Sequence, residues 1–425
     1  MASDIASFSH RLTALNQRTA RRLSMVADLD TIPQSLRFRF EGDYRRALQL
    51  GRQHRDHPED VATIAALADI HRRNCKFRAA ENYLLKALAL EPLNQALLFN
   101  LGDMYLENGE HTKAWSTYQE IIYLNPESIE ARLAQGRVRE DEGNYRAAMA
   151  IYDQLENDFG PSAGTYAGRT LNHMGQGDYG TAVAVAREGL ALYPDHAPLY
   201  VARGQAYAGL GLVDRAKTDF YDALSLDADL MSAYAALGEV SLQEGNASTA
   251  VRAYLRVLDD RPGDAAASLN LGRAYLMDLR LREAVEEWEM LGYLHPEDQA
   301  SQHWLPEAYY LYSLELRDQG RFQDALDAHG KAKSMAEGRH SGWMTTALVR
   351  AGDAAWEHDD YQRALDYYSQ ATENDPFRAE AYIGLGRTYR AMGDSVKALT
   401  TLHQALTIDP GHPDARLELQ QISRP

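Results

Sequence analysis

The stretch QALLFNLGDMYLENGEHTKAWSTYQEIIYLNPES, residues 95–128, carries the pattern that decides the fold. It has a small residue at its eighth place (Gly102), a glycine at its fifteenth (Gly109), an alanine at its twentieth (Ala114) and a proline at its thirty-second (Pro126). Large apolar or aromatic residues stand three or four positions apart between them, which is the spacing of one helical face. The stretch therefore predicts a helix, a tight turn, a second helix and a stop.

This 34-residue pattern recurs along most of the chain. It runs without an insertion over residues 61–298, in seven frames, and resumes in three frames that begin at residues 306, 345 and 379. The twentieth place is alanine in all ten frames, namely Ala80, Ala114, Ala148, Ala182, Ala216, Ala250, Ala284, Ala325, Ala364 and Ala398. We therefore predict an all-α superhelix built from stacked helical hairpins.

These residues resemble the tetratricopeptide repeat (TPR) family, whose pattern of small residue, aromatic, glycine, alanine and final proline they reproduce. The resemblance covers roughly residues 61–412. It implies a right-handed α-solenoid of about ten or eleven repeats, in which the first helices line a concave groove that binds a peptide or helix of a protein partner. The chain is similar to stand-alone bacterial members of the family that act as assembly scaffolds.

Both ends extend the repeats. In residues 1–60, positions 42–47 resemble the second helix of a degenerate half-repeat, and an amphipathic stripe with flanking arginines runs from Ile5 to Val26. We expect this stripe to cap the first repeat or to contact another copy; a protein partner or an anionic membrane surface is the alternative. Residues 413–425 predict a helix that caps the last apolar face.

Composition restricts the class of protein. A formal charge of −17 over 425 residues argues against general nucleic-acid binding, which depends on clustered Lys and Arg. No apolar run approaches the ~18 residues of a membrane span, and residues 1–30 lack the apolar core of a secretory signal. The single cysteine, Cys75, leaves no disulfide framework within the chain. We expect a cytoplasmic protein.

Motifs that carry chemistry are missing from the sequence. It contains no phosphate-binding loop, HExxH pair or CxxC pair. Gly175, Gly177 and Gly180 spell GxGxxG, but they fall in a predicted turn between helices and follow no strand, so they are not a dinucleotide-binding fingerprint. The sequence predicts no catalytic residue, no cofactor and no metal site.

The first helix of each frame uses its fourth, seventh, eighth and eleventh places for the core, which leaves the opposite face for binding. By the resemblance, this face lines the groove. Its candidate residues are Phe99, Asn100, Asp103, Leu133, Arg137, Leu171, Met174, Val201, Gln205, Glu239, Leu242, Leu269, Asn270, Arg273 and Leu276. In the central frames they predict an apolar trough with isolated polar groups, which suits a helix or an extended apolar peptide. Alternatively, a tightly wound superhelix or the chain's own N-terminal part covers them.

The period breaks around one frame. Seven extra residues, 299–305, precede the irregular frame 306–339, and five more, 340–344, follow it. Two regular frames then occupy residues 345–412. Insertions on both sides of a repeat bend or loosen nearest-neighbour stacking. Trp304, Tyr310 and Trp343 gather there and predict a second interface, because aromatic residues often anchor interfaces. Alternatively, both tryptophans fill the gap left by irregular stacking.

The sequence therefore favours a non-enzymatic scaffold or adaptor that binds a protein partner in its groove. Two alternatives stay open. One is a structural homo-oligomer, in which the N-terminal part docks into the groove of another copy. The other is a regulatory subunit of a separately encoded enzyme.

Overall fold

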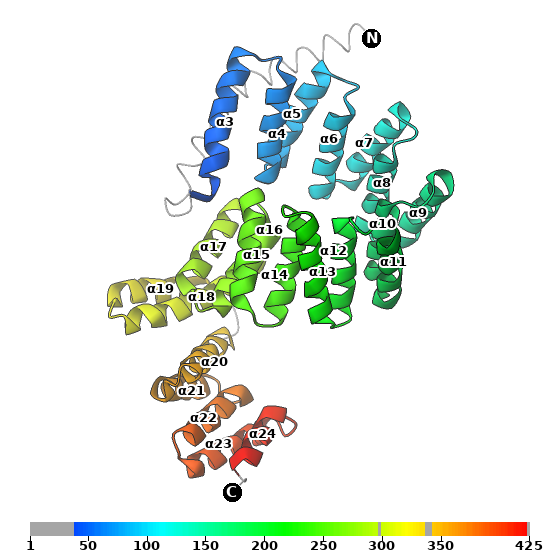
Figure 1. Ribbon diagram of the computed structural model, residues 1–425. Helices are drawn as coiled ribbons and strands as arrows, with labels where there is room; N and C mark the ends of the chain where they lie inside the picture. Colours follow the sequence, from blue (N-terminus) through cyan, green and yellow to red (C-terminus); the bar gives the residue numbers. More distant parts are fainter. Residues whose placement is uncertain (1–37, 296–298, 336–341, 423–425) are drawn as a thin grey trace. The chain divides into compact units, whose positions relative to one another are not determined.

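The computed structural model describes residues 38–295, 299–335 and 342–422 (Figure 1). Every regular element within these ranges is an α-helix, and consecutive helices pair as hairpins across short turns. This confirms the predicted all-α repeat fold. The amphipathic stripe between Ile5 and Val26 lies outside the described residues. The chain divides into two compact units, residues 1–274 and 275–425.

The first unit consists of a leading helix and a series of hairpins. The leading helix is α3 (Phe38–Asp56), and the hairpins are α4 (Val61–Arg73) with α5 (Phe77–Leu90), α6 (Gln95–Glu107) with α7 (His111–Leu124), α8 (Ile129–Asp141) with α9 (Tyr145–Phe159), α10 (Ala163–Gly175) with α11 (Tyr179–Leu192), α12 (Ala197–Gly209) with α13 (Val213–Leu226), and α14 (Met231–Gln243) with α15 (Ala247–Asp260). The boundary between the units falls inside α16 (Ala265–Met277).

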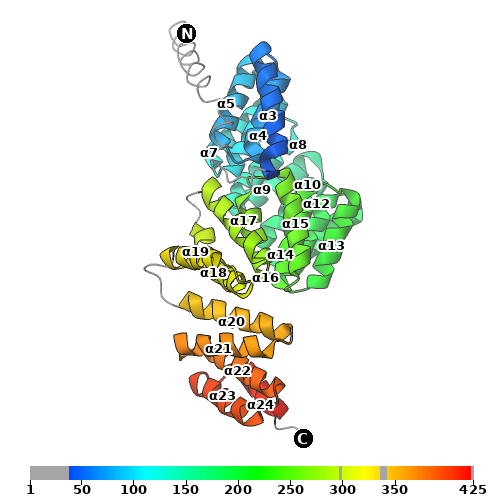
Figure 2. The ribbon, with the colours of Figure 1, turned by 90° about the vertical axis from the view of Figure 1, so that its left-hand side faces the viewer.

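The second unit continues the same scheme. Its helices are α17 (Leu281–Leu294), α18 (Gln299–Asp318), α19 (Phe322–Met335), α20 (Gly342–Glu357), α21 (Tyr361–Asn374), α22 (Ala379–Ala391), α23 (Ser395–Ile408) and α24 (Pro413–Ile422). Figure 2 shows α20, α21 and α22 in successive layers. The division between the units therefore lies earlier than the break in the period after residue 298, because α17 packs against α18.

The expected insertion 299–305 is helical. It forms the first turns of α18, which continues through Pro306 into the predicted frame. α18 then packs against α17, α19 and α20. The extra residues therefore lengthen a first helix and do not form a separate loop.

The turn inside each hairpin depends on a left-handed backbone at the fifteenth place. Seven frames have glycine there, with positive φ at Gly109, Gly143, Gly177, Gly211, Gly245, Gly320 and Gly393. The other three frames adopt the same conformation without glycine, at Cys75 (φ 53°), Leu279 (φ 55°) and Asp359 (φ 59°). The hairpin geometry therefore imposes the conformation, and glycine accommodates it with the least strain.

Close packing inside each hairpin explains the small residue at the eighth place. A Cβ on Gly102 would lie 2.5 Å from the Tyr118 ring, and one on Gly204 would lie 2.5 Å from the Phe220 ring. Both rings belong to the twenty-fourth place and are fully buried. The first helix can approach the second this closely only because the glycine leaves room for the ring.

Helices at both ends cover the outer repeats. α3 packs against α4 and buries Ala47, which is consistent with the half-repeat predicted at residues 42–47. α24 packs against α22 and α23 and buries Ala415, as a terminal cap requires. Within the described residues, no helix is both long and apolar enough to cross a membrane.

Candidate partner-binding face

The candidate site is the face of the first helices that points away from their hairpin partners, called here the groove face. One residue from the ninth place of each frame lies on it, and in the first unit these residues form the ninth-place column. From α6 to α14 the column contains Asp103, Arg137, Leu171, Gln205 and Glu239. All five side chains are exposed or half-buried, and Leu171 is 38% exposed although it is apolar. The column is therefore accessible and chemically mixed.

Tyrosines from the hairpin cores reach this face. The Tyr118 hydroxyl donates to Asp103 Oδ1 at 2.7 Å, and Arg137 of the next repeat lies 3.9 Å from the same oxygen. Burial and the Asp103 charge raise the pKa of Tyr118. The ring anchors the carboxylate, and the carboxylate orients the arginine of the following repeat. Two residues chosen from the sequence, Asp103 and Arg137, are therefore brought together.

The same arrangement recurs in the second unit. The Tyr368 hydroxyl donates to Asp353 Oδ1 at 2.5 Å, and Arg387 Nη2 lies 2.8 Å from that oxygen. Arg387 also donates to the Tyr368 hydroxyl at 3.1 Å. Asp353 and Arg387 occupy the ninth places of neighbouring frames. The sequence did not lead us to predict this pair. The same signal, an aspartate and an arginine 34 residues apart, identifies Asp103 and Arg137 in the first unit.

A third set includes Tyr254, Glu239 and Arg273. Burial and the Glu239 charge raise the pKa of Tyr254, whereas the Arg273 charge lowers it. Arg273 Nη1 donates to Asn270 Oδ1 at 2.9 Å. Two of the polar residues expected on the groove face, Asn270 and Arg273, therefore interact, and the charges of Glu239 and Arg273 both act on Tyr254.

The predicted apolar trough is narrower than the sequence suggested. Val201, Leu242 and Leu276 are only 5%, 8% and 5% exposed, so they belong to the core. Their places in the frame point to the groove face, but neighbouring helices cover them. The remaining candidates stay accessible to different degrees: Asn100 is exposed, and Phe99, Leu133, Met174 and Leu269 are half-buried.

Aromatic residues near the break in the period pack inside the unit. The Trp304 ring lies 6.5 Å from the fully buried Trp288 ring at an interplanar angle of 24°, and the Arg350 guanidinium lies 5.7 Å from the Trp304 ring. Tyr310 is 6% exposed. The side chain of Trp343 lies outside what the structure describes. Trp304 and Tyr310 therefore pack inside the unit, as the alternative expected of Trp304.

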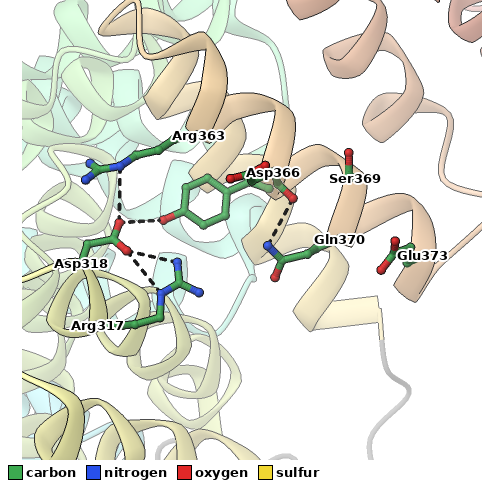
Figure 3. Close-up of a pocket in the computed structure, with 8 residues that line it drawn as sticks. Arg317, Asp318, Arg363, Asp366, Ser369, Gln370 and Glu373 are labelled. Carbon is green, nitrogen blue, oxygen red and sulfur yellow. Dashed lines mark hydrogen bonds and ion pairs between the residues drawn. The ribbon is translucent and has the colours of Figure 1, made fainter. Parts of the chain in front are cut away.

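A polar cavity of about 480 Å³ lies between the end of α18 and one face of α21 (Figure 3). Asp318 is its central group: Arg317 Nη2 lies 3.1 Å away, Arg363 Nε lies 3.9 Å away, and the Tyr367 hydroxyl donates to it at 3.2 Å. The lining is completed by Asp366, Ser369, Gln370 and Glu373. The sequence did not predict this cavity, because its two helices come from frames that the insertion 340–344 separates. Both arginines already pair with Asp318, so we assign the cavity no ligand.

The groove face also contains a carboxyl group whose pKa is raised. Burial raises the pKa of Glu140, on α8, to about 7, and the neighbouring Tyr152, Arg137 and Asn172 offset only part of that rise. Among the described residues, no group of three His, Cys, Asp or Glu side chains is arranged to hold a metal.

Comparison with known proteins identifies the family. The tetratricopeptide repeat model matches residues 65–129, 171–229, 235–290 and 349–413, which together make up more than half of the chain. The chain therefore belongs to the tetratricopeptide repeat family, whose repeats generally mediate protein–protein interactions.

Individual relatives are distant. The human protein O-mannosyl-transferase TMTC1 is 24% identical over 212 residues, covering 49% of this chain and 24% of that protein. The photosystem I assembly protein Ycf3 of Acaryochloris marina is 33% identical over 85 residues, covering 19% of this chain and 51% of that protein. The chain thus spans at most about half the length of either. A tetratricopeptide repeat protein from Parabacteroides merdae aligns at 21% identity over 57% of this chain and 99% of that one, with a TM-score of 0.42.

Proposed function

We propose that this chain is a non-enzymatic scaffold that binds a peptide or helix of a protein partner on the groove face of its first unit. The observation that carries the proposal is the ninth-place column. Its five accessible side chains come from five consecutive repeats and include both charges, an amide and an exposed leucine. Such a row can contact successive side chains along an extended partner. It does not resemble the arrangement of residues that catalyses a reaction on a small molecule.

The spacing of the column sets the size of the partner segment. First helices of neighbouring repeats contact each other, as α8 with α10 and α10 with α12. Packed helices lie about 8–10 Å apart. An extended chain advances about 3.3 Å per residue, so about three residues pass each repeat. The column from Asp103 to Glu239 therefore suits an extended segment of about 12 residues.

A displayed library of random 12-residue peptides tests the proposal. Peptides are selected on the wild-type chain, and their affinity is then compared between the wild type and the variant Leu171→Glu. This variant places a charge in the middle of the column. Leu192→Glu is the matched control, because Leu192 is 55% exposed at the end of α11 and lies off the column. We expect affinity to fall at least tenfold for Leu171→Glu and to stay within twofold for the control. Selected peptides that bind all three proteins equally would disprove the groove-face site.

Self-association is the second candidate, and one observation favours it. Phe322 and Leu326, one turn apart on α19, are each 66% exposed, whereas the corresponding places of α21, Tyr361 and Leu365, are half-buried. An exposed apolar pair on a repeat helix favours contact with another copy of the chain, because the contact would remove apolar surface from water. Light scattering would then show a dimer for the wild type and a monomer for Leu326→Glu.

A further inference from the structure

The first unit closes on itself. The segment made of the last residue of α15 and the turn to α16, residues 260–264, lies against the turn between α4 and α5, although about 190 residues of chain separate them (Figure 1). Gly263 N donates to Arg73 O at 3.3 Å, and Arg73 Nη1 donates to Asp260 O at 3.1 Å. Arg261 Nη1 lies 3.1 Å from Glu107 Oε1, which also pairs with Arg72 at 3.0 Å.

Sterically, this contact requires glycine at position 263. A Cβ there would lie 2.6 Å from the backbone carbon of Asn74, a distance that a rigid main chain cannot accommodate. Gly411 occupies the same thirty-third place of its own frame, and a Cβ on it would meet only the Asp409 carboxylate, at 3.4 Å. The two glycines therefore form a matched pair in which only Gly263 depends on the closed arrangement.

The closing contact is weaker than the stacking of neighbouring repeats. Its contacts include two hydrogen bonds to backbone carbonyl groups and ion pairs of Arg261 and Asp260, whose side chains are 41% and 42% exposed. Exposed ion pairs contribute little to stability because water and salt screen them, whereas each repeat buries an apolar face against the next. The contact can thus break while the hairpins on both sides stay folded.

We propose that residues 260–264 and the α4–α5 turn form a latch that opens and closes in solution while the repeats stay folded. The latch holds the first unit as a closed turn, and its release separates the first repeats from α15 and α16. This deepens the proposed function, because opening uncovers the part of the groove face that Arg261 covers, at the ends of α4 and α6, and so extends the accessible column. Opening removes Arg261 from Glu107, which keeps its ion pair with Arg72.

Cys75 reports on the latch. It lies in the α4–α5 turn, it is the only cysteine of the chain, and its side chain is half-buried. It directly follows Asn74, whose backbone carbon would lie 2.6 Å from a Cβ on Gly263. Burial and the charges of Asp264 and Glu107 raise the pKa of the thiol to about 11, although the Arg261 charge lowers it. The rate of Cys75 alkylation by iodoacetamide therefore measures how often the latch opens.

We expect Gly263→Val to accelerate alkylation at least fivefold and Gly411→Val to leave it unchanged, with circular dichroism confirming that both stay folded. Equal rates in the folded wild type and Gly263→Val would overturn the latch. So would wild-type alkylation with the same denaturant dependence as global unfolding, since Cys75 would then react only through unfolding. The experiment uses no partner, so its failure is distinguishable from failure of the proposed function, which the peptide library decides.

A second variant covers the case in which Gly263→Val does not fold. Asp264→Cys places a new thiol near Cys75, and we expect mild oxidation to join the two in a monomeric chain. Asp229→Cys, at the corresponding turn of the preceding repeat, is the control and should stay reduced. Failure of Asp264→Cys to cross-link would show that the closed turn does not form in solution.

Discussion

At the scale of single residues, the fifteenth place of each frame requires a left-handed backbone. Three frames adopt it without glycine, which costs free energy of folding. Leu279 adopts φ 55°, a region in which a Cβ costs roughly 1–2 kcal/mol. Its side chain is 39% exposed, so little apolar burial depends on it.

We therefore expect Leu279→Gly to raise the free energy of unfolding by about 1 kcal/mol, measured as an upward shift of the thermal midpoint. The reciprocal change, Gly245→Ala at φ 78°, should lower stability by a similar amount. A lower midpoint for Leu279→Gly would show that the leucine contributes packing that outweighs its strain.

Glu140 makes stability depend on pH. Its pKa is about 7 in the folded chain and 4.5 as the ordinary value, so the folded state holds the proton more tightly between these values. The unfolding free energy should therefore fall as pH rises from about 4.5 to 7, and the contribution stays lost above pH 7.

Glu140→Gln should remove this dependence and gain at most about 3 kcal/mol at pH 8 relative to the wild type. Urea unfolding at pH 5 and pH 8 measures both proteins. A difference between the two proteins that is the same at both pH values would contradict the shifted pKa.

At the scale of helices and hairpins, glycines of similar appearance in the sequence have opposite roles. Gly204, inside α12, faces the Phe220 ring and the Ala216 carbonyl, so a Cβ has no space. Gly330, inside α19, has no atom within 4 Å of the position of a Cβ. One glycine is required by packing, whereas the other only weakens its helix.

Alanine at these two positions should therefore have opposite effects. We expect Gly204→Ala to destabilise by about 1–3 kcal/mol through overpacking, and Gly330→Ala to stabilise by up to about 1 kcal/mol through helix propensity. Thermal unfolding followed by circular dichroism measures both. Equal effects of the same sign would contradict the packing described for the α12–α13 hairpin.

At the scale of the whole molecule, the latch and the repeats should respond differently to salt. Ion pairs between partly exposed side chains, such as Arg261 with Glu107, weaken as added salt shortens the Debye length, which is about 10 Å at 0.1 M ionic strength, whereas apolar stacking does not weaken. We expect the Cys75 alkylation rate to rise severalfold between 0.05 and 0.5 M NaCl while the thermal midpoint changes little. A rate that is independent of salt would mean that the backbone contacts at Gly263 alone close the turn.

The groove face shows what was predictable and what was not. Asp103 and Arg137 were recognised from the sequence because each first helix repeats the same orientation, so their ninth places align. Val201, Leu242 and Leu276 were expected on that face as well, yet they are buried. Periodicity gives the direction of a side chain along one helix, but burial depends on how closely the neighbouring helices approach.

Local spacing in the amino-acid sequence specifies the hairpins, their turns and their order. These rest on contacts within about 34 residues, such as Gly102 with Tyr118, and local spacing encodes such contacts directly. The cavity between α18 and α21 and the closure of Gly263 onto Arg73 could be seen only in the folded chain. Closure follows from small rotations that accumulate over six repeats, and no single repeat encodes their sum.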